Sequence, residues 1–428
     1  MTYQPPDQSI PDMRSRVLAV LEGEKPDRIP FISRMELWYS CHARSGTLPE
    51  KFRTSYTGQT PSILSTFVVP VPAETPGMRL TEIHQMLGFG QQHQMIVHAR
   101  ELHGVELIMK LNGEEFFHET DPLVDYFPRL FNMMKLDTPG ETEAIFITPV
   151  GRLTTRSLLA PEAIEAGAIP IMNEYPIKSF GDLPALEYIY EHAEFVTRFE
   201  EVHRIEQALG CIGFVVPFLD RIPFQKACLD LFGEVPFFYA MHDNPAGIER
   251  LMALLDQVTR QDIRGLATFD YPYTQFDDNL DGTITNPKLY QKYCLPQYQA
   301  YTELLHAQGK KVGSHTDGNL KRLAKWMPES GLDVFESFSP APLTDCTFDE
   351  AWAAWEGRGP IIWGGIPSVL LEAGQPQADL ETYLDRLLER VGSRPIILGV
   401  SDLLMANNDI ERVRYIARRL SEFTVPEN

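Results

Sequence analysis

The run KKVGSH (residues 310–315) decides the fold together with three later runs, LDVFES (332–337), PIIWGG (360–365) and RPIILGV (394–400). Each run is short and apolar, and a polar stretch with helical spacing follows it. Two earlier runs, CIGFVVPF (211–218) and GLATFDY (265–271), show the same alternation of an apolar run and a polar helical stretch. This alternation is typical of a parallel sheet covered by helices. The second half of the chain therefore predicts an α/β fold.

The first half adds a helical segment and a set of hairpins. Apolar residues at helical spacing predict a helix within residues 13–30, and Phe31 and Ile32 begin a short strand. Between residues 101 and 155 the pattern alternates with period two between Gly, Pro and Asn turns, which favours antiparallel hairpins. We therefore predict a (β/α)8 TIM-type barrel with an N-terminal helical segment and an antiparallel hairpin insertion. Residues 1–12 are expected to form a flexible arm, and residues 13–428 a single domain.

Composition restricts the partners of the chain. It has 428 residues, and 38 Lys and Arg against 59 Asp and Glu give a net charge of −21, which disfavours nucleic acid and membrane surfaces. No run of apolar residues is long enough to span a membrane, and no secretion signal is found. The five cysteines have no close spacing, which favours a reducing cytoplasm. They are Cys41, Cys211, Cys228, Cys294 and Cys346.

Polar residues follow the predicted strands. In a parallel barrel the carboxyl ends of all strands meet at one rim, so these residues are expected to lie together. Glycines there let the backbone approach a ligand closely. From the second predicted strand of the C-terminal half to the last, the residues at or after the strand ends are Asp277, Asp278, Asn279, Asp281, His315, Asp317, Glu336, Gly364, Gly365, Ser401 and Asp402.

His315 and Asp317 form the most specific candidate for a metal-binding motif. A neutral imidazole can bind a metal, and a nearby carboxylate can join it or orient it, so a cation such as Zn²⁺ would suit the pair. Alternatively, Asp317 caps a helix that begins at Asn319, and His315 binds a backbone carbonyl.

The other carboxylates also allow two interpretations. Glu336 follows an apolar strand, where a carboxylate is costly unless it is hydrogen-bonded or bound to a metal. Asp277 and Asp278 are either functional or part of an acidic loop with a Gly turn. Asp402 either joins the site or caps the last helix. No phosphate-binding loop, nucleophile elbow or dinucleotide fingerprint is present.

The chain resembles the uroporphyrinogen decarboxylase superfamily, which includes cobalamin-dependent methyltransferases. The motifs that carry the resemblance are VLAVLEGEKPDRIPF (17–31), TPVGRLTTR (148–156), PIKSFGDLPALEY (176–188), TQFDDNLDGTITNPKLYQKYCLPQYQAY (274–301) and GSHTDGNLKRLAKWMPESGLDVFE (313–336). The resemblance implies a distorted (β/α)8 barrel with its site at the strand carboxyl ends. It also suggests a homodimer.

Site residues distinguish branches of this superfamily. Decarboxylases carry an Arg-rich RQAGRY-like segment after the first strand, whereas this chain has SRMELWYSCHARSG (33–46). Arg34, Glu36, Trp38 and Tyr39 therefore suggest a less anionic, aromatic substrate. TPVGRLT (148–154) looks closer to ether-cleaving methyltransferases than to decarboxylases.

The zinc ligands of the methyltransferase branch are only partly matched. That branch holds zinc with His-x-Cys and a further Cys, where this chain has His315-Thr316-Asp317 and Val400-Ser401-Asp402. Zinc would thus need oxygen ligands from Asp317, Glu336, Asp277 or Asp402.

The resemblance favours a methyltransferase that demethylates a small methoxylated, aromatic substrate and passes the methyl group to the cob(I)alamin of a separate corrinoid protein. The alternative is a cofactor-independent decarboxylase, and a non-catalytic corrinoid-binding scaffold is a third possibility. The expected catalytic residues are His315, Asp277, Asp278 and Glu336. Substrate is expected at Arg34, Glu36, Trp38, Tyr39, Asn279 and Gly364, and a metal at His315, Asp317, Glu336 and Asp402.

Overall fold

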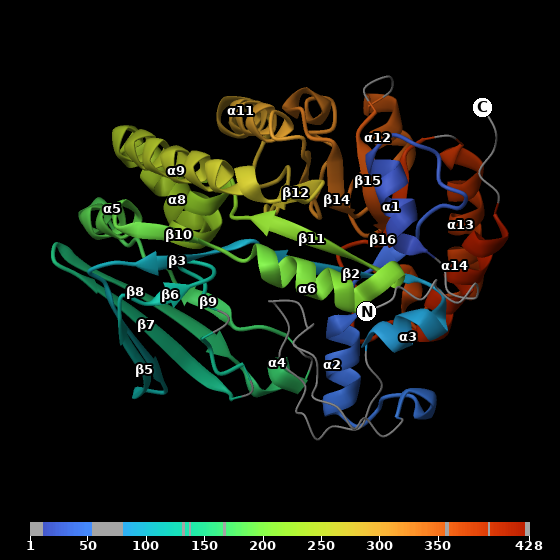
Figure 1. Cartoon of the computed structure of the whole chain (residues 1–428), viewed down its shortest axis with the longest axis horizontal. Helices are drawn as coiled ribbons and strands as arrows, with labels where there is room; N and C mark the ends of the chain where they lie inside the picture. Colours follow the sequence, from blue (N-terminus) through green and yellow to red (C-terminus); the bar gives the residue numbers. More distant parts are fainter. Residues whose placement is uncertain are drawn as a thin grey trace.

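Eight parallel strands form the centre of the molecule in a computed structural model (Figure 1). The structure describes residues 12–53, 80–130, 133–136, 138–165, 168–355, 359–392 and 394–423, so most of the predicted arm lies outside the described residues. In sheet order the strands are β1 (Ile32–Ser33), β2 (Gly90–Ile96), β11 (Gly213–Leu219), β12 (Tyr273–Phe276), β13 (Lys311–His315), β14 (Val334–Phe338), β15 (Ile361–Ile366) and β16 (Ile396–Val400).

The sheet closes into a barrel between its first and last strands. Phe31 forms a parallel bridge with Leu398, and the Leu398 amide donates a hydrogen bond to the Pro30 carbonyl at 2.9 Å. The amide of Val400 donates to Ser33 Oγ at 3.1 Å. These contacts join β16 to β1, which confirms the predicted TIM-type barrel.

Helices cover the outside of the barrel (Figure 1). In α9, Pro245 takes the first position and Asn244 caps the helix by accepting a hydrogen bond from the Gly247 amide at 3.0 Å. The helices are α1 (Met13–Leu21), α2 (Glu36–Arg44), α3 (Leu80–Leu87), α6 (Phe199–Leu209), α7 (Pro223–Lys226), α8 (Glu234–Asp243), α9 (Pro245–Gly265), α10 (Pro287–Leu289), α11 (Leu295–His306), α12 (Phe348–Trp355), α13 (Gln377–Val391) and α14 (Ile410–Glu422). Among the described helices, none is long and apolar enough to span a bilayer.

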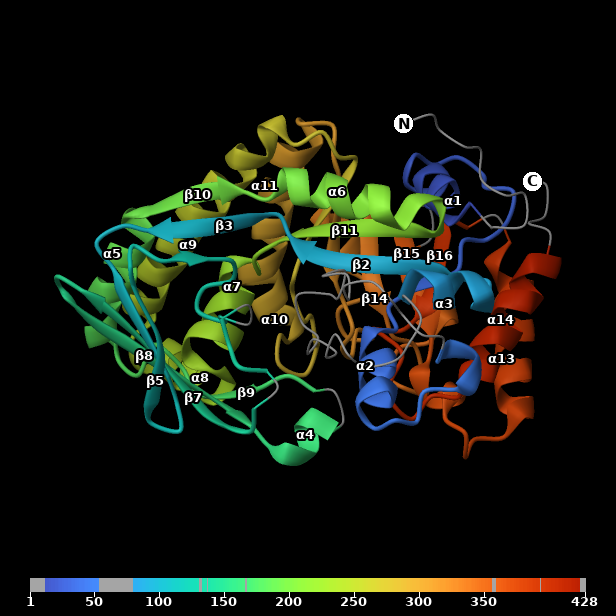
Figure 2. The ribbon, with the colours of Figure 1, turned by 60° about the horizontal axis from the view of Figure 1, so that its bottom comes forward.

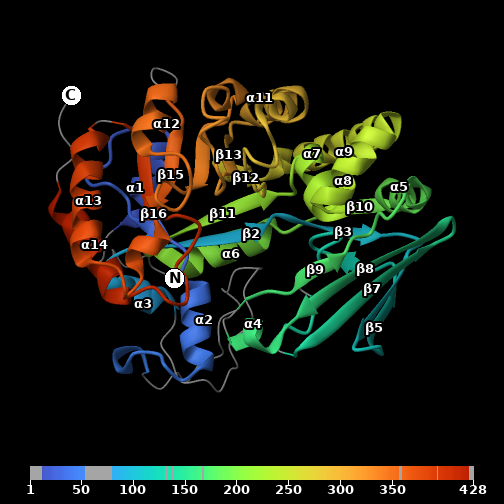
Figure 3. The same cartoon turned by 180° about the vertical axis from the view of Figure 1, so that it is seen from behind.

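An insertion between β2 and β11 forms two antiparallel sheets beside the barrel (Figures 2 and 3). Buried Leu107, Met109 and Phe146 alternate with more exposed residues, as the period-two pattern predicted. The sheet orders are β10-β3-β6 and β5-β4-β7-β8-β9. The insertion contains β3 (His98–Leu102), β4 (Glu106–Leu111), β5 (Glu114–Thr120), β6 (Leu123–Val124), β7 (Gly140–Thr148), β8 (Gly151–Leu159), α4 (Pro161–Glu165), β9 (Ile171–Glu174), α5 (Leu183–Glu191) and β10 (Ala193–Thr197).

The predicted strand at residues 265–271 is wrong. Gly265 ends α9, and β12 begins only at Tyr273. The rings of Phe269 and Tyr271 stack with centroids 5.5 Å apart, and the Tyr271 hydroxyl donates to the Val215 carbonyl at 2.8 Å. These residues therefore pack against the barrel as a loop.

Neither helix cap proposed for the site aspartates is present. Residues 319–326 contain no helix, so Asp317 caps none. The last helix, α14, takes Asp409 as its N-cap, and the Asp409 side chain accepts a hydrogen bond from the Glu411 amide. Asp317 and Asp402 are therefore available for other contacts.

Candidate active site

A cavity of about 980 Å³ opens at the carboxyl ends of the barrel strands. It collects residues that follow β1, β12, β13 and β16, as the strand-end argument predicted. Residues of the insertion and of α2 complete its wall. The charged and amide side chains of the lining are Arg34, Glu36, Gln94, Arg129, Arg221, Glu234, Asp277, Asn279, Asp281, His315, Asp317, Asp402 and Asn407.

His315 is the last residue of β13 and is 6% exposed. Its Nδ1 lies 2.7 Å from Glu336 Oε2, a hydrogen bond that fixes the ring. Its Nε2 faces two further carboxylates, with Asp317 Oδ2 at 3.7 Å and Asp402 Oδ1 at 3.4 Å. The ring therefore has one fixed nitrogen and one nitrogen beside carboxylates that line the cavity.

Glu336 is held by a cage of donors inside the barrel. Its Oε2 accepts from His315 and from Gln275 Nε2 at 3.2 Å. Its Oε1 accepts from Gln92 Nε2 at 2.6 Å, Gln94 Nε2 at 3.1 Å and Ser337 Oγ at 3.0 Å. With these five donors and an exposure of 1%, Glu336 orients the imidazole and is not itself part of the cavity wall.

The mutual charges of His315 and Glu336 determine the protonation state of each side chain. Burial lowers the pKa of His315, but the charges and hydrogen bonds of Glu336 and Asp317 outweigh burial and hold that pKa well above its ordinary value. Burial likewise raises the pKa of Glu336, but the charge and hydrogen bond of His315, with the charge of Arg34, bring it down to about 2. The pair is therefore an imidazolium and a carboxylate at neutral pH.

Arg34 engages Asp402. Its Nη2 pairs with Asp402 Oδ1, its Nε and Nη2 each lie 3.2 Å from the Asp402 carbonyl, and its Nη1 donates to Gln94 Oε1 at 2.7 Å. Two strand ends, after β1 and β16, are thereby tied together beside His315.

The donors predicted for a metal do not converge on one point. Glu336 binds the Nδ1 side of His315, whereas Asp317 and Asp402 lie near Nε2, and Arg34 already holds Asp402. This arrangement does not fit a zinc ion, because a tetrahedral site needs its ligands around a common centre. Zinc at this position stays a prediction.

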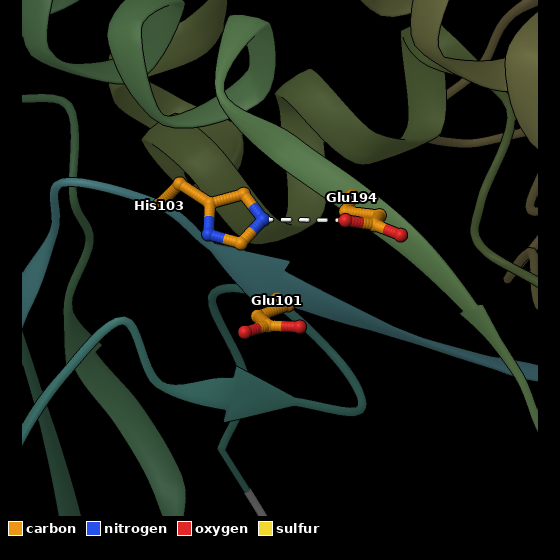
Figure 4. Close-up of side chains that lie close together, drawn as sticks. All are labelled: Glu101, His103 and Glu194. Atoms are coloured by element: carbon orange, nitrogen blue, oxygen red, sulfur yellow. Dashed lines mark hydrogen bonds and ion pairs between the residues drawn. The ribbon is translucent and has the colours of Figure 1, made fainter.

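Within the described residues, a group of metal-capable side chains whose ligand atoms all lie within 4.8 Å of one another occurs elsewhere, in the insertion. It consists of Glu101 on β3, His103 just after it and Glu194 on β10, with His103 Nε2 3.4 Å from Glu194 Oε2 (Figure 4). These side chains are outside the cavity lining, and those of His103 and Glu194 are 46% and 67% exposed.

Asp277 and Asp278 have different surroundings. Asp277 lines the cavity and accepts a hydrogen bond from the Tyr126 hydroxyl at 2.9 Å, and burial raises its pKa. Asp278 is fully buried and lies outside the lining. It accepts hydrogen bonds from the Tyr298 hydroxyl at 2.8 Å, Ser314 Oγ at 3.0 Å and the Ile222 amide at 3.0 Å. Asp278 therefore links these neighbouring segments and stabilises the fold.

The residues predicted to bind substrate also divide into two groups. Arg34, Glu36 and Asn279 line the cavity, and burial raises the pKa of Glu36 to about 7. Trp38 and Tyr39 are buried away from the lining, and Trp38 Nε1 donates to the Asn408 carbonyl at 3.0 Å. Their aromatic rings therefore stabilise α2 and are placed to contact neighbouring side chains, not substrate.

Gly364 lies in the barrel wall and not in the cavity lining. Its φ is 129°, and a Cβ built there would lie 2.7 Å from the Phe338 carbonyl oxygen. The glycine is thus needed for the close approach of β14 and β15, where their register shifts between Phe335 and Phe338.

Sequence reasoning missed several residues of the site. Arg221 comes just after β11, so the strand-end argument could have identified it. Gln92 and Gln94 lie on β2, whose polar sequence was not recognised as a strand. Arg129 belongs to the insertion, and no local pattern connects it with the barrel rim.

Comparisons with known proteins agree with this architecture. A sequence profile of the uroporphyrinogen decarboxylase (URO-D) family matches residues 163–423, more than half of the chain. A solved methyltransferase from Methanosarcina mazei is similar over 96% of this chain and 98% of that chain, with a TM-score of 0.54 and 12% sequence identity. At that identity the likeness shows the fold alone. No curated protein sequence matches the chain.

Proposed function

This chain belongs to the uroporphyrinogen decarboxylase (URO-D) family, and from that premise we propose that it is a methyltransferase. Its substrate is a small methoxylated aromatic compound, and the methyl acceptor is the cob(I)alamin of a separate corrinoid protein. The TPVGRLT motif supports this branch of the superfamily, and the similarly folded Methanosarcina mazei protein is a methyltransferase.

The observation that carries the proposal is the position of His315, which lines the cavity while Glu336 fixes its Nδ1. Cleavage of an aryl methyl ether breaks the bond between methyl carbon and oxygen, and the oxygen leaves with the electron pair. His315 Nε2 supplies the proton that neutralises this oxygen, while Glu336 holds Nδ1 at 2.7 Å. The corrinoid cofactor of the partner would supply the electron pair for the new bond to the methyl carbon.

Asp317 and Asp402 help to keep His315 protonated, because both lie close to its ring. Both lie within 3.7 Å of His315 Nε2, so they favour its charged form before the ether is cleaved. Arg34 limits the negative charge that Asp402 presents to the substrate, because its guanidinium is paired with that carboxylate. The chain thus supplies orientation and a proton, and the partner supplies the nucleophile.

The test is methyl transfer with purified components. The full chain is mixed with reduced corrinoid protein and a panel of methoxyarenes, and the visible spectrum of the corrinoid is followed. We expect methylcobalamin to form with the wild type and its formation to fall at least about hundredfold in His315→Ala, the lower range for loss of a general acid. His306→Ala is the matched control, since His306 binds Asp333 at 2.7 Å outside the cavity lining.

Two results would contradict the proposal. One is the absence of methylcobalamin across the whole panel with wild-type protein. The other is full activity of a folded His315→Ala variant, which would make His315 structural.

Decarboxylation is the second candidate, because three arginines line the cavity and could hold substrate carboxylates. Arg34 follows β1, Arg221 follows β11, and Arg129 belongs to the insertion. Asp277, whose pKa is raised by burial, would then face a protonated pyrrole. Release of carbon dioxide from uroporphyrinogen by the purified chain would favour this activity over methyl transfer.

A further inference from the structure

Two arginines on the cavity wall have no part in the proposed methyl transfer. Arg129 follows β6 in the insertion, and Arg221 follows β11 in the barrel. Arg221 Nη1 donates to Asn279 Oδ1 at 2.8 Å, and Asn279 Nδ2 lies 3.4 Å from Asp317 Oδ2. Because Asp317 lies beside His315, this side of the wall is continuous with the reacting centre.

The two guanidinium groups share one buried carboxylate. Asp230 is fully buried, with Arg129 Nη2 at 2.8 Å, Arg221 Nε at 3.4 Å and Lys226 Nζ at 3.4 Å. Lys226 also pairs with Asp220 at 2.7 Å. Three cations therefore share two carboxylates in direct ion pairs, and Asp277 adds a further negative charge close to both arginines.

Glu234 and Asp277 also lie on this wall. Glu234 is exposed and, over the residues the structure describes, forms no ion pair with either guanidinium. Asp277 accepts from the Tyr126 hydroxyl, and Arg221 contacts its backbone carbonyl. The guanidinium groups thus keep donor capacity toward the cavity.

We infer that Arg129 and Arg221 bind a carboxylate group of the substrate. This inference rests on the proposed function and narrows its substrate class to methoxylated aromatic carboxylates. A guanidinium fork matches the two oxygens of a carboxylate. Glu234, Asp277 and Asp317 line the same cavity, so a group with a single negative charge fits here better than a phosphate monoester, which carries about −1.5 to −2.

Such a substrate is less anionic than a tetrapyrrole with many carboxylates. The carboxylate end would lie at the Arg129 and Arg221 wall, and the methoxy end would lie toward His315 Nε2. Apolar residues that line the same cavity, Leu229 and Ile284, offer a surface for the ring between these ends.

The test measures binding, which does not need the corrinoid partner. Isothermal titration calorimetry compares 4-methoxybenzoate with the neutral 4-methoxybenzamide on the full chain. We expect the acid to bind the wild type about tenfold to hundredfold more tightly than the amide, the range for charge-assisted hydrogen bonds. In Arg129→Gln this preference should fall to about threefold or less, and Arg129→Lys should keep part of it.

Arg152→Gln is the matched control, because Arg152 is an exposed cation on β8 outside this cavity. Its preference for the acid should equal that of the wild type. Circular dichroism checks the fold of Arg129→Gln, in which Asp230 keeps Arg221 and Lys226. If that variant does not fold, the wild-type comparison of acid and amide still decides the inference.

Several outcomes would overturn the inference. Equal affinity of the wild type for acid and amide would do so, as would an undiminished preference in folded Arg129→Gln. Tighter binding of 4-methoxyphenyl phosphate than of the benzoate would overturn the choice of carboxylate. Binding of the benzoate without methyl transfer in the corrinoid assay would refute the proposed function and leave this site standing. Methyl transfer from neutral methoxyarenes alone would support the proposed function and refute the carboxylate site.

Discussion

Replacing Glu336 by Gln is the most informative single change in the protein. The side chain keeps its shape, but one acceptor oxygen becomes an amide donor. If the new carbonyl takes the place of Oε1, it keeps Gln92, Gln94 and Ser337. His315 Nδ1 and Gln275 Nε2 then face a donor, so two of the five hydrogen bonds are lost.

The expected loss of stability follows from these two bonds. Each is a hydrogen bond to a buried charged group and contributes about 1.5–3 kcal/mol, which gives about 3–6 kcal/mol in total. The fall of the Glu336 pKa from 4.5 to about 2 corresponds to about 3 kcal/mol, at the lower end of that range. An acid whose pKa is lower in the folded state contributes its stability above about pH 4.5 and loses it as the pH falls toward 2.

Urea unfolding followed by circular dichroism measures both effects. At pH 7 we expect the free energy of unfolding of Glu336→Gln to be about 3–6 kcal/mol below the wild type, and the gap to narrow between pH 4.5 and pH 2. Glu249→Gln is the control, since Glu249 is an exposed residue 3.5 Å from Lys292, and should change stability by less than about 0.5 kcal/mol. A loss below about 1 kcal/mol at pH 7, or a gap independent of pH, would refute the account of the donor cage.

Three further changes separate packing from function. Gly364→Ala should lower the free energy of unfolding by about 2–4 kcal/mol, because its φ is 129° and the new Cβ meets the Phe338 backbone; an unchanged melting temperature would contradict this. Trp38→Phe should cost about 1–3 kcal/mol, through loss of the hydrogen bond to Asn408, and leave KM for methoxyarenes unchanged. A raised KM without loss of stability would place Trp38 in the substrate site. Asp278→Ala should lower the urea midpoint, because it leaves Tyr298, Ser314 and the Ile222 amide without their hydrogen-bond acceptor. A stability equal to the wild type would show that this carboxylate does not stabilise the fold.

The strand-end argument predicted that His315, Asp317 and Asp402 meet at one rim, because the local patterns there are plain. An apolar run stops at His315 and another ends near Asp402, and parallel strands of a barrel bring such ends together whatever their distance in sequence. The same argument could not tell which side chains face the cavity. Asp277 and Asp278 are adjacent in sequence, yet only Asp277 lines it.

Strand β2 was missed for a physical reason. Its sequence GQQHQMI is fully buried but largely polar, whereas a buried parallel strand normally shows an apolar run. Gln92 and Gln94 are polar because they donate to Glu336, a partner 242 or more residues away. Local periodicity contains no information on a partner so distant.

Aromatic residues caused two further misplacements. Phe269 and Tyr271 gave residues 265–271 the composition of a strand, although Gly265 still belongs to α9. Trp38 and Glu36 lie two positions apart on α2, and such residues do not share a helix face. Because Glu36 lines the cavity, Trp38 could not also do so.

The cavity wall has two sources, and this has an evolutionary consequence. The barrel supplies His315 and the carboxylates around it, whereas Arg129 and Tyr175 come from the segment inserted between β2 and β11. Exchange of that segment between relatives would therefore change which molecule is accepted and leave the reacting imidazole in place. Related proteins could thus acquire new substrates through changes in this insertion alone, while selection kept the barrel rim constant.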